Sequence, residues 1–347
     1  MITVLIVDDS AVARQYIRHI LESDSEVQVI GTASDGEDAV EFLKERTPDV
    51  VTMDINMPGM NGHEATRMIM ETNPVPIVIV SASYDRSDVE KSFRAMEAGA
   101  VAILEKPAGP GHPDFESTSR DLLKTVKLMS EVRVVRRWPR GKLREARSDS
   151  ETAVKCPRLI VIGASTGGPP VIQTILLGLK PGFRAPVMIV QHIAKGFIEG
   201  MAEWLANETG LSIGIAADGE TLRPGRIYFA PDDCHMGVVN GGRVALSKAP
   251  PENGIRPSVA HLFRSAIASY GGEAVGILLT GMGRDGAAEL KQMRDCGALT
   301  IAQDKESSVI YGMPGEAIRL DGATLVLPPE RIASRLASLI GANGQSK

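Results

Sequence analysis

Five polar side chains in the first third of the chain each stand at or just after the end of a short apolar run. They are Asp8, Asp9, Asp54, Ser81 and Lys106. The carboxyl ends of parallel strands open onto one crevice, so residues far apart in the sequence converge there. Three crowded carboxylates favour a hard divalent cation, for which magnesium is the natural candidate. Asp54 could then accept a phosphoryl group, with the Ser81 hydroxyl and the Lys106 ammonium supporting it.

A simpler interpretation assigns these residues to local structure. Asp8 and Asp9 could cap a helix that begins near Ser10, and Asp54 could open a turn before the sequence Met-Pro-Gly at 57–59. This explains a single residue well. It explains five residues at separate strand ends poorly, so we favour the phosphoryl-acceptor site.

A second set of reactive residues lies in the other half of the chain. Ser165, in VIGASTGG, follows an apolar run and precedes a helix start, where a tight turn would expose its hydroxyl beside helix N–H groups. His192 follows PVMIVQ, and Asp285 follows GILLTGMGR. Together they supply a nucleophile, a base and an orienting carboxylate, the logic of a hydrolytic triad. Their order differs from that of chymotrypsin, subtilisin and the α/β-hydrolases, which convergence permits.

Each triad residue also has an alternative interpretation. The turn at Ser165 could cradle a nucleotide phosphate or cap a helix, although it lacks the full GxGxxG spacing and a Walker lysine. Asp285 could cap a helix. His235 is the rival histidine, and Cys234 beside it is the rival nucleophile. Neighbours on an extended segment point to opposite faces, which weakens that pair.

The elements that must position these residues form two α/β domains. Apolar runs alternate with segments of helical period, and the runs are continuously apolar, which is typical of parallel sheets covered on both faces. Five runs between Ile2 and Leu104 predict a doubly wound, flavodoxin-like first domain. A second series begins with LIVIG at 159–163 and predicts another doubly wound domain. It includes a β-hairpin turning at the Asn-Gly-Gly of 240–242.

A basic segment separates the two domains. Nine basic and four acidic residues lie between Glu131 and Arg158, a net charge of +5. A solvated connector is the simpler interpretation, and docking on an acidic surface is the alternative. We therefore predict domains at 1–125 and 158–342, joined by a linker at 126–157.

Composition excludes several classes of protein. With 43% hydrophobic and 23% charged residues, the 347-residue chain is typical of a globular protein. A net charge of −5 gives no reason to bind nucleic acid. Three widely spaced cysteines favour neither a disulfide framework nor a zinc site and suit the reducing cytoplasm. With no long apolar run and no leader pattern, we expect neither membrane insertion nor secretion.

The phrases LIVDDS, MDINMPGMNG, VSAS and EKP resemble the markers of response-regulator receiver domains. The resemblance implies phosphorylation of Asp54 by a sensor histidine kinase of the chemotaxis type. It also implies a cis bond between Lys106 and Pro107. The implied magnesium ligands are Asp8, Asp9, Asp54 and the backbone carbonyl of Asn56.

Nearly the whole chain resembles the chemotaxis protein-glutamate methylesterase (CheB) family. The shared phrases include GASTGG, VQHIAKGF, YFAPDDCHM, RPSV, LTGMGRDGA and IAQDKESSVIYGMP. The resemblance implies hydrolysis of glutamyl γ-methyl esters on methylated chemoreceptors, deamidation of receptor glutamines, and no cofactor for the esterase. Ser165 would attack, His192 would transfer the proton and Asp285 would hold the imidazole. The Met282 N–H would stabilise the oxyanion, with Thr166 lining the pocket.

Some positions depart from the family pattern, namely Asn56, Ile255, Ala260 and the Ile-Ala pair at 193–194. They leave the triad untouched but bear on phosphate lifetime and substrate contacts. Two other functions stay open at this point. One is a receiver-linked serine hydrolase with a nonreceptor substrate, and the other is a noncatalytic signalling module switched by phosphorylation.

Overall fold

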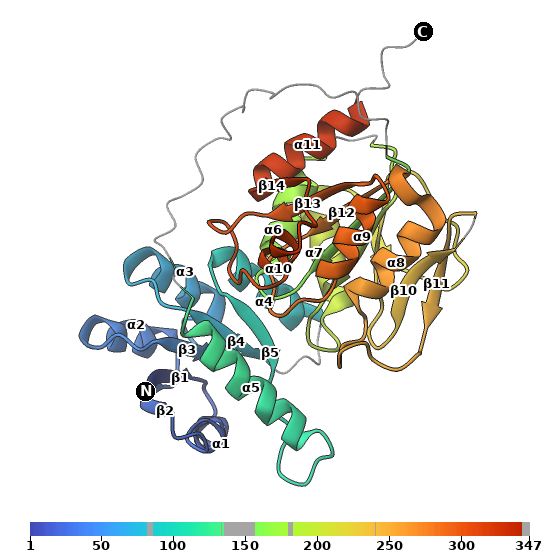
Figure 1. The fold of residues 1–347 in the computed structure, drawn as a ribbon. Helices are drawn as coiled ribbons and strands as arrows, with labels where there is room; N and C mark the ends of the chain where they lie inside the picture. Colours follow the sequence, from blue (N-terminus) through green and yellow to red (C-terminus); the bar gives the residue numbers. More distant parts are fainter. Residues whose placement is uncertain (82–85, 133, 135–156, 180–182, 240, 342–347) are drawn as a thin grey trace. The chain divides into compact units, whose positions relative to one another are not determined.

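The computed structural model divides into two compact units, Met1–Leu143 and Arg144–Lys347 (Figure 1). The structure describes residues 1–81, 86–132, 134, 157–179, 183–239 and 241–341. Most of the predicted linker at 126–157 therefore lies outside the described residues. Each unit is considered by itself.

The first unit is a five-stranded parallel sheet with the strand order β2-β1-β3-β4-β5. Its strands are β1 (Ile2–Val7), β2 (Val27–Ala33), β3 (Val50–Met53), β4 (Ile77–Ser81) and β5 (Ala102–Glu105). Its helices are α1 (Ala11–Leu21), α2 (Gly36–Glu45), α3 (Gly62–Thr72), α4 (Arg86–Ala98) and α5 (Phe115–Met129). The strand order reverses between β1 and β3, which confirms the predicted doubly wound fold and places a crevice at the carboxyl ends of these strands.

The helices of the first unit are amphipathic, and each buries one apolar stripe. In α1 the buried residues are Ile17, Ile20 and Leu21. In α5 they include Val126 and Met129. The domain boundary predicted after residue 125 thus falls inside α5, because the apolar stripe of this helix continues for another turn.

The second unit contains a seven-stranded parallel sheet with the order β14-β13-β12-β6-β7-β9-β8. The strands are β6 (Leu159–Ala164), β7 (Val187–Gln191), β8 (Ser212–Ile215), β9 (Arg226–Phe229), β12 (Ala274–Leu278), β13 (Leu299–Gln303) and β14 (Leu325–Leu327). The helices are α6 (Gly168–Leu177), α7 (Ile198–Thr209), α8 (Val259–Tyr270), α9 (Ala287–Asp295), α10 (Met313–Arg319) and α11 (Pro329–Gly341). This arrangement confirms the second predicted α/β domain.

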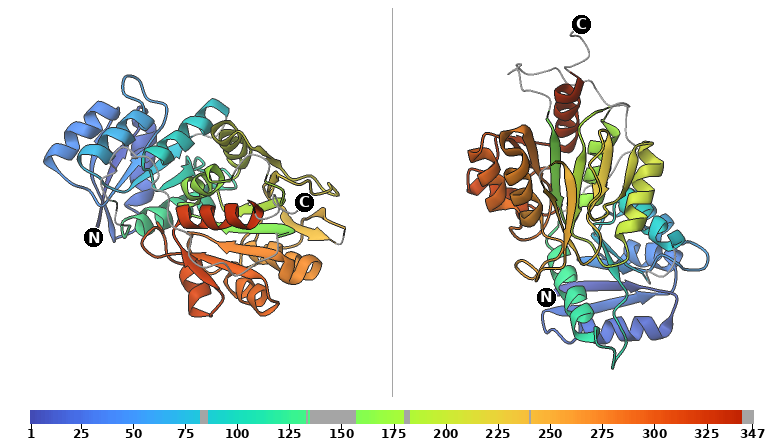
Figure 2. Two further views of the ribbon diagram at one scale, coloured as in Figure 1. Left: turned by 90° about the horizontal axis from the view of Figure 1, so that it is seen from above. Right: turned by 90° about the vertical axis from the view of Figure 1, so that its right-hand side faces the viewer.

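Helices cover both faces of the second sheet. In Figure 2, α8 and α9, in orange, lie on one side of the sheet, and α7, in yellow-green, lies on the other. The predicted hairpin is present as β10 (His235–Val239) and β11 (Arg243–Ser247), which pair antiparallel and form a separate two-stranded sheet. Strand β10 packs on α8, which joins the hairpin to the rest of the unit.

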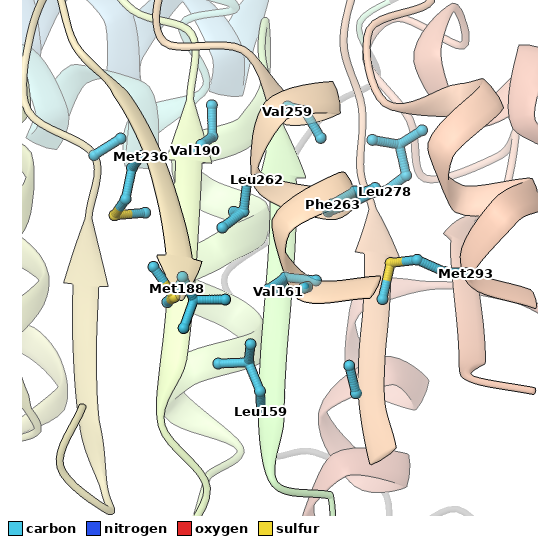
Figure 3. Packing of buried hydrophobic residues seen from close by; sticks show 14 of the residues in the cluster. Leu159, Val161, Met188, Val190, Met236, Val259, Leu262, Phe263, Leu278 and Met293 are labelled. Carbon is cyan, nitrogen blue, oxygen red and sulfur yellow. The ribbon is translucent and has the colours of Figure 1, made fainter. Parts of the chain in front are cut away.

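The core of the second unit lies between its sheet and α8. Val161 of β6 and Met188 of β7 face Leu262 and Phe263 of α8, and Met236 of β10 closes one side (Figure 3). All five side chains are fully buried. Truncating one such large apolar side chain costs about 3 kcal/mol or more, so α8 is firmly held against β6 and β7. No described helix is long and apolar enough to cross a membrane.

Candidate functional site

The first unit brings three of the predicted residues into direct contact. Asp8 follows β1, Asp54 follows β3 and Lys106 follows β5, so three strand ends meet in the crevice. The Lys106 ammonium lies 2.8 Å from Asp8 Oδ2 and 2.9 Å from Asp54 Oδ2. Both carboxylates are buried, so little water is available to screen their charges.

Helix capping does not account for these carboxylates. The N-cap of α1 is Ser10, whose hydroxyl accepts a hydrogen bond from the Ala13 N–H. At the start of this helix, Asp8 accepts a hydrogen bond from the backbone N–H of Ser10, at 2.9 Å, and does not act as the cap. Asp54 accepts from Ile55 N at 2.8 Å, and the next helix, α3, has its own cap. Helix capping therefore leaves most of the negative charge in the crevice unexplained.

The acidic side chains of the crevice fit a magnesium ion. Carboxylate oxygens of Asp8, Asp9 and Asp54 lie within 4.8 Å of one another, and hard oxygen ligands are those that Mg²⁺ prefers. Burial raises the pKa of Asp54, and the neighbouring Asp8 adds to this effect, while the Lys106 ammonium opposes it. One lysine ammonium faces the two buried carboxylates of Asp8 and Asp54, so a further cation would be favourable here.

Ser81 and Asn56 occupy different surroundings. The Ser81 hydroxyl is buried and has no hydrogen-bond partner among the described residues. Asn56 is exposed, and its side-chain oxygen accepts a hydrogen bond from Lys91 at 3.0 Å. Its backbone carbonyl, the group predicted to bind magnesium, is not engaged by that contact.

The predicted cis bond between Lys106 and Pro107 is wrong. Within the described part of the chain, the cis peptide bond lies between Arg256 and Pro257 instead. The trans form is intrinsically favoured for an X-Pro bond. Lys106 reaches Asp8 and Asp54 with its following peptide bond trans.

In the second unit, three adjacent strands position the predicted triad. Ser165 directly follows β6 and His192 directly follows β7, the neighbouring strand. Asp285 lies in the loop after β12, the strand on the other side of β6. Because Ala164 pairs with Gln191 in the sheet register, the residues that follow them leave the sheet side by side.

A tight turn presents Ser165 at the start of α6. Gly167 has a φ of 77°, and a Cβ atom there would lie 2.6 Å from side-chain atoms of Val309, so glycine is required. The Gly168 N–H donates to the Ser165 carbonyl at 2.8 Å and closes the turn. The half-buried Ser165 thus stands beside the N–H groups of a helix N-terminus, where negative charge is stabilised.

His192 and Asp285 are in contact. The Nε2 atom of His192 lies 3.0 Å from Asp285 Oδ2, and Asp285 is only 5% exposed. Burial by itself would raise the pKa of Asp285. The contact with His192 and the N–H groups of Val259 and Ala260 outweigh burial and hold the pKa below its usual value. Asp285 is therefore ionised at neutral pH and can orient the imidazole.

The Ser165 hydroxyl does not contact the base, His192, through a hydrogen bond. Among the described residues, no hydrogen bond links it to His192. Catalytic hydrogen bonds often tighten only when substrate binds. The two predicted pocket residues differ in exposure, since Thr166 is half-buried and Met282 is exposed. A Cβ on Gly281 would lie 2.6 Å from Ser165 Cβ, which places the chain leading to Met282 against the serine.

Gln191 was missed in the sequence analysis. Its side-chain amide nitrogen donates to the backbone carbonyls of both Ser165 and His192, each at 2.8 Å. The side chain is 3% exposed. Gln191 therefore links the loop that carries Ser165 to the loop that carries His192. A polar residue at the end of an otherwise apolar strand, directly before the histidine, was the available signal.

Ser258 was also missed as a site residue. Its hydroxyl donates to Asp285 Oδ1 at 3.0 Å, and the backbone N–H groups of Val259 and Ala260 donate to the same carboxylate. The capping interpretation of Asp285 was thus partly right, although the helix whose N-terminus it meets is α8 and not the following helix, α9. The RPSV phrase around Ser258 was the signal.

The rival histidine takes no direct part in this arrangement. His235 is fully buried, its Nδ1 accepts from the Ser258 N–H, and its Nε2 lies 3.2 Å from the Pro250 carbonyl. His235, Glu252 and His261 could together suggest a metal site. However, the two imidazole rings are stacked, and Arg264 pairs with Glu252. Stacked rings do not direct their in-plane lone pairs at one ion, so this cluster is unsuited to a metal.

The comparisons with known proteins concern both units of the chain. The family model of the response regulator receiver domain matches residues 4–112, and that of CheB methylesterase matches residues 160–336. Two curated relatives, both named protein-glutamate methylesterase/protein-glutamine glutaminase, are similar over almost their whole length. That of Nitrosospira multiformis is 52% identical, covering 100% of this chain and 99% of the relative, and that of Geobacter metallireducens is 53% identical, covering 98% and 99%.

A solved structure is also similar to the second unit. The catalytic domain of the CheB methylesterase of Thermotoga maritima is 36% identical and aligns with a TM-score of 0.51. The match covers 53% of this chain and 99% of that domain. The parallel α/β fold of the second unit is thus shared with a methylesterase catalytic domain.

Proposed function

This chain belongs to the CheB methylesterase family, and from that premise we propose that it hydrolyses glutamyl γ-methyl esters on chemoreceptors and deamidates receptor glutamines. The observation that carries the proposal is the convergence of Ser165, His192 and Asp285 from three neighbouring strands, with His192 3.0 Å from a buried, ionised Asp285. The names of the relatives supply the substrate class.

We propose that Ser165 Oγ attacks the ester carbonyl while His192 accepts the hydroxyl proton. Since Nε2 of His192 faces Asp285, Nδ1 is the ring nitrogen left to take that proton. The negative charge on the carbonyl oxygen is stabilised by the Met282 N–H and by the start of α6, where Thr166 lines the pocket. His192 returns the proton to the methoxy group, the C–O bond breaks, and methanol leaves.

The second half of the reaction restores the enzyme. The glutamyl group is now esterified to Ser165, and His192 takes a proton from a water molecule that attacks this ester. The proton then passes to Ser165 Oγ as the bond breaks, which releases the glutamate side chain. A glutamine substrate would follow the same steps with ammonia as the leaving group. Asp285 stays ionised throughout and stabilises the imidazolium.

We propose that the first unit is a phosphorylation switch for this reaction. Asp54 would accept the phosphoryl group from a sensor histidine kinase of the chemotaxis type, and Ser81 and Lys106 would bind the new oxygens. Magnesium would be held by Asp8, Asp9, Asp54 and the Asn56 carbonyl, and it would neutralise the charge that accumulates on transfer. The Lys106 Nζ atom lies 2.9 Å from Asp54 Oδ2.

The departure at Ala260 does not favour a different function. Ala260 is 4% exposed, so its side chain is not available to a receptor. Its contribution to the site is a backbone N–H, which donates to Asp285 at 3.0 Å whatever the side chain. Ile255 is half-buried next to this segment.

Methanol release from methylated receptor membranes tests the proposal. The full chain should release methanol, and a small phosphodonor with magnesium should change the rate. Ser165→Ala should abolish release while leaving phosphorylation of Asp54 intact. Near-normal release by Ser165→Ala would show the mechanism to be wrong. Turnover of a simple carboxylic ester without turnover of receptor would instead indicate a nonreceptor substrate.

A further inference from the structure

The carboxylate of Asp285 lies in a cradle of three donors from one helix start. Val259 N donates to Oδ2 at 2.7 Å, Ala260 N donates to Oδ1 at 3.0 Å, and Ser258 Oγ donates to Oδ1 at 3.0 Å. The remaining contact, from Oδ2, is with His192. The cradle therefore determines how the carboxylate is turned toward the imidazole.

Ser258 differs from the other two donors because it acts through its side chain. It is fully buried and is the N-cap of α8, where its hydroxyl oxygen accepts from the His261 N–H at 3.4 Å. The hydroxyl hydrogen points to Asp285, with Glu252 Oε2 a longer alternative at 3.5 Å. One hydroxyl thus joins the cap of α8 to the triad carboxylate, and capping and donation can be separated by substitution.

His235 holds the backbone of Ser258 in place. The Ser258 N–H donates to His235 Nδ1 at 3.2 Å, so that nitrogen carries a lone pair. The ring proton is then on Nε2 and donates to the Pro250 carbonyl, 3.2 Å away. The ring is also stacked on His261, with centroids 4.9 Å apart. A buried neutral imidazole with both nitrogens engaged is suited to positioning a neighbour.

We propose that Ser258 is a positioning residue of the triad, which holds Asp285 against His192, and that His235 in turn positions Ser258. The inference rests on the proposed function, because it assigns Ser258 a role through Asp285. Without the hydroxyl, one carboxylate oxygen loses a buried donor and the carboxylate can rotate away from the imidazole. The turnover number should then fall while KM for the receptor stays nearly constant, since both Ser258 and His235 are fully buried.

Four single substitutions in the full chain test the role of the hydroxyl. Ser258→Ala should lower kcat for methanol release about 10- to 100-fold, as expected for the loss of one hydrogen bond to a buried charge. Ser258→Thr should restore kcat to within about threefold of the wild type. Ser258→Asp keeps an acceptor for the cap but places a carboxylate against Asp285, so it should be slower than Ser258→Ala. Ser265→Ala, on the same helix, is the matched control and should leave kcat unchanged.

A double-mutant comparison separates this role from a general effect on folding. In an Asp285→Ala background, Ser258→Ala should cause no further loss of kcat, because its only route to the reaction has been removed. An equal fold-loss in both backgrounds, or wild-type kcat in Ser258→Ala, would overturn the inference. High methanol release by Asp285→Ala itself would instead overturn the proposed function, so the two failures are distinguishable.

Substitutions at His235 provide a second test if the Ser258 variants unfold. In His235→Asn the amide oxygen can take the place of Nδ1 and accept from the Ser258 N–H, whereas in His235→Gln the amide reaches toward the position of Nε2. The asparagine variant should therefore have a kcat about 10-fold above that of the glutamine variant at equal KM. Equal kcat values in the two folded variants would contradict the role assigned to His235.

Discussion

Asp54 and Asp285 are both buried aspartates beyond the strand ends of a parallel sheet, yet their pKa values shift in opposite directions. Burial and the neighbouring Asp8 raise the pKa of Asp54 above its usual value. Burial acts in the same sense on Asp285, but His192 and two backbone N–H groups bring its pKa below the usual value. The difference lies in the donors around each carboxylate and not in the depth of burial.

The comparison suggests why the two carboxylates suit different chemistry. Asp54 shares one lysine with Asp8, so its charge is incompletely compensated and a cation or a covalent change would relieve it. Asp285 accepts three hydrogen bonds from the start of α8 in addition to the histidine contact. It can therefore remain ionised while charge develops on its neighbour. A poorly compensated carboxylate suits an acceptor, and a well-compensated one suits an orienting group.

The largest effect should come from neutralising the well-compensated carboxylate. Asp285→Asn should lower kcat for methanol release about 10⁴-fold, because the amide cannot stabilise the imidazolium and favours the wrong tautomer. Combining it with Ser165→Ala should cost little beyond the serine substitution alone, since the triad acts as a unit. The measurement is methanol release from methylated receptor membranes. Additive losses would show that the residues act independently.

Neutralising the poorly compensated carboxylate should instead remove regulation. Asp54→Asn should abolish aspartyl phosphorylation and, with it, the change in methanol release caused by a phosphodonor, a coupling we expect to be about 5- to 150-fold. Mass spectrometry after phosphodonor treatment locates the modified residue. Phosphate on another residue, or labelling that proceeds equally well after magnesium is removed, would disprove the assignment.

A smaller effect should follow from loosening the link between the two reactive loops. Gln191→Met keeps the bulk but loses the amide that binds the Ser165 and His192 carbonyls, so kcat should fall about 10-fold. Gln191→Glu replaces the donor with an acceptor facing two carbonyls and should be more severe. Both rates are measured by methanol release at saturating receptor. If both variants were as fast as the wild type, the hydrogen bonds donated by Gln191 would not matter for catalysis.

The smallest effects concern stability and should have opposite signs. Asp54 has a raised pKa, so its ionised form destabilises the fold above that pKa, and Asp54→Asn should stabilise the first unit at pH 7 by about 1 kcal/mol. Asp285 has a lowered pKa, so its ionised form stabilises the fold. This stabilisation is present above the pKa of Asp285 in the unfolded chain and is lost as the pH falls through its pKa in the folded protein. Asp285→Asn should thus destabilise the second unit at pH 7.

Calorimetry of the full chain measures these shifts. The unfolding temperature of the first unit should rise by a few degrees in Asp54→Asn, and that of the second unit should fall by a few degrees in Asp285→Asn. As the pH falls below the raised pKa to the lower pKa of the unfolded chain, the advantage of Asp54→Asn should disappear, because the wild-type carboxyl is then neutral in both states. Shifts of the same sign in both variants at pH 7 would contradict the comparison on which they rest.

The strand ends and the residue types standing on them could be predicted from the sequence alone. Continuous apolar runs before Asp8, Asp54, Ser165 and His192 predict buried parallel strands, and such strands expose the residues that follow them at one edge of a sheet. The hairpin at 235–247 was equally predictable, because its turn signal is local. These features depend on neighbours in the sequence, which a single chain displays directly.

The donors around each carboxylate were decided by the tertiary structure. Ser258 lies 27 residues before Asp285, and Gln191 lies 26 residues after Ser165. Which of these polar groups meet depends on β6 lying between β7 and β12. It also depends on the N-terminus of α8 lying against the Asp285 loop. No local pattern encodes that order, because hydrophobic burial is satisfied by any arrangement of apolar strands, whereas a hydrogen bond requires its two partners to be within about 3 Å.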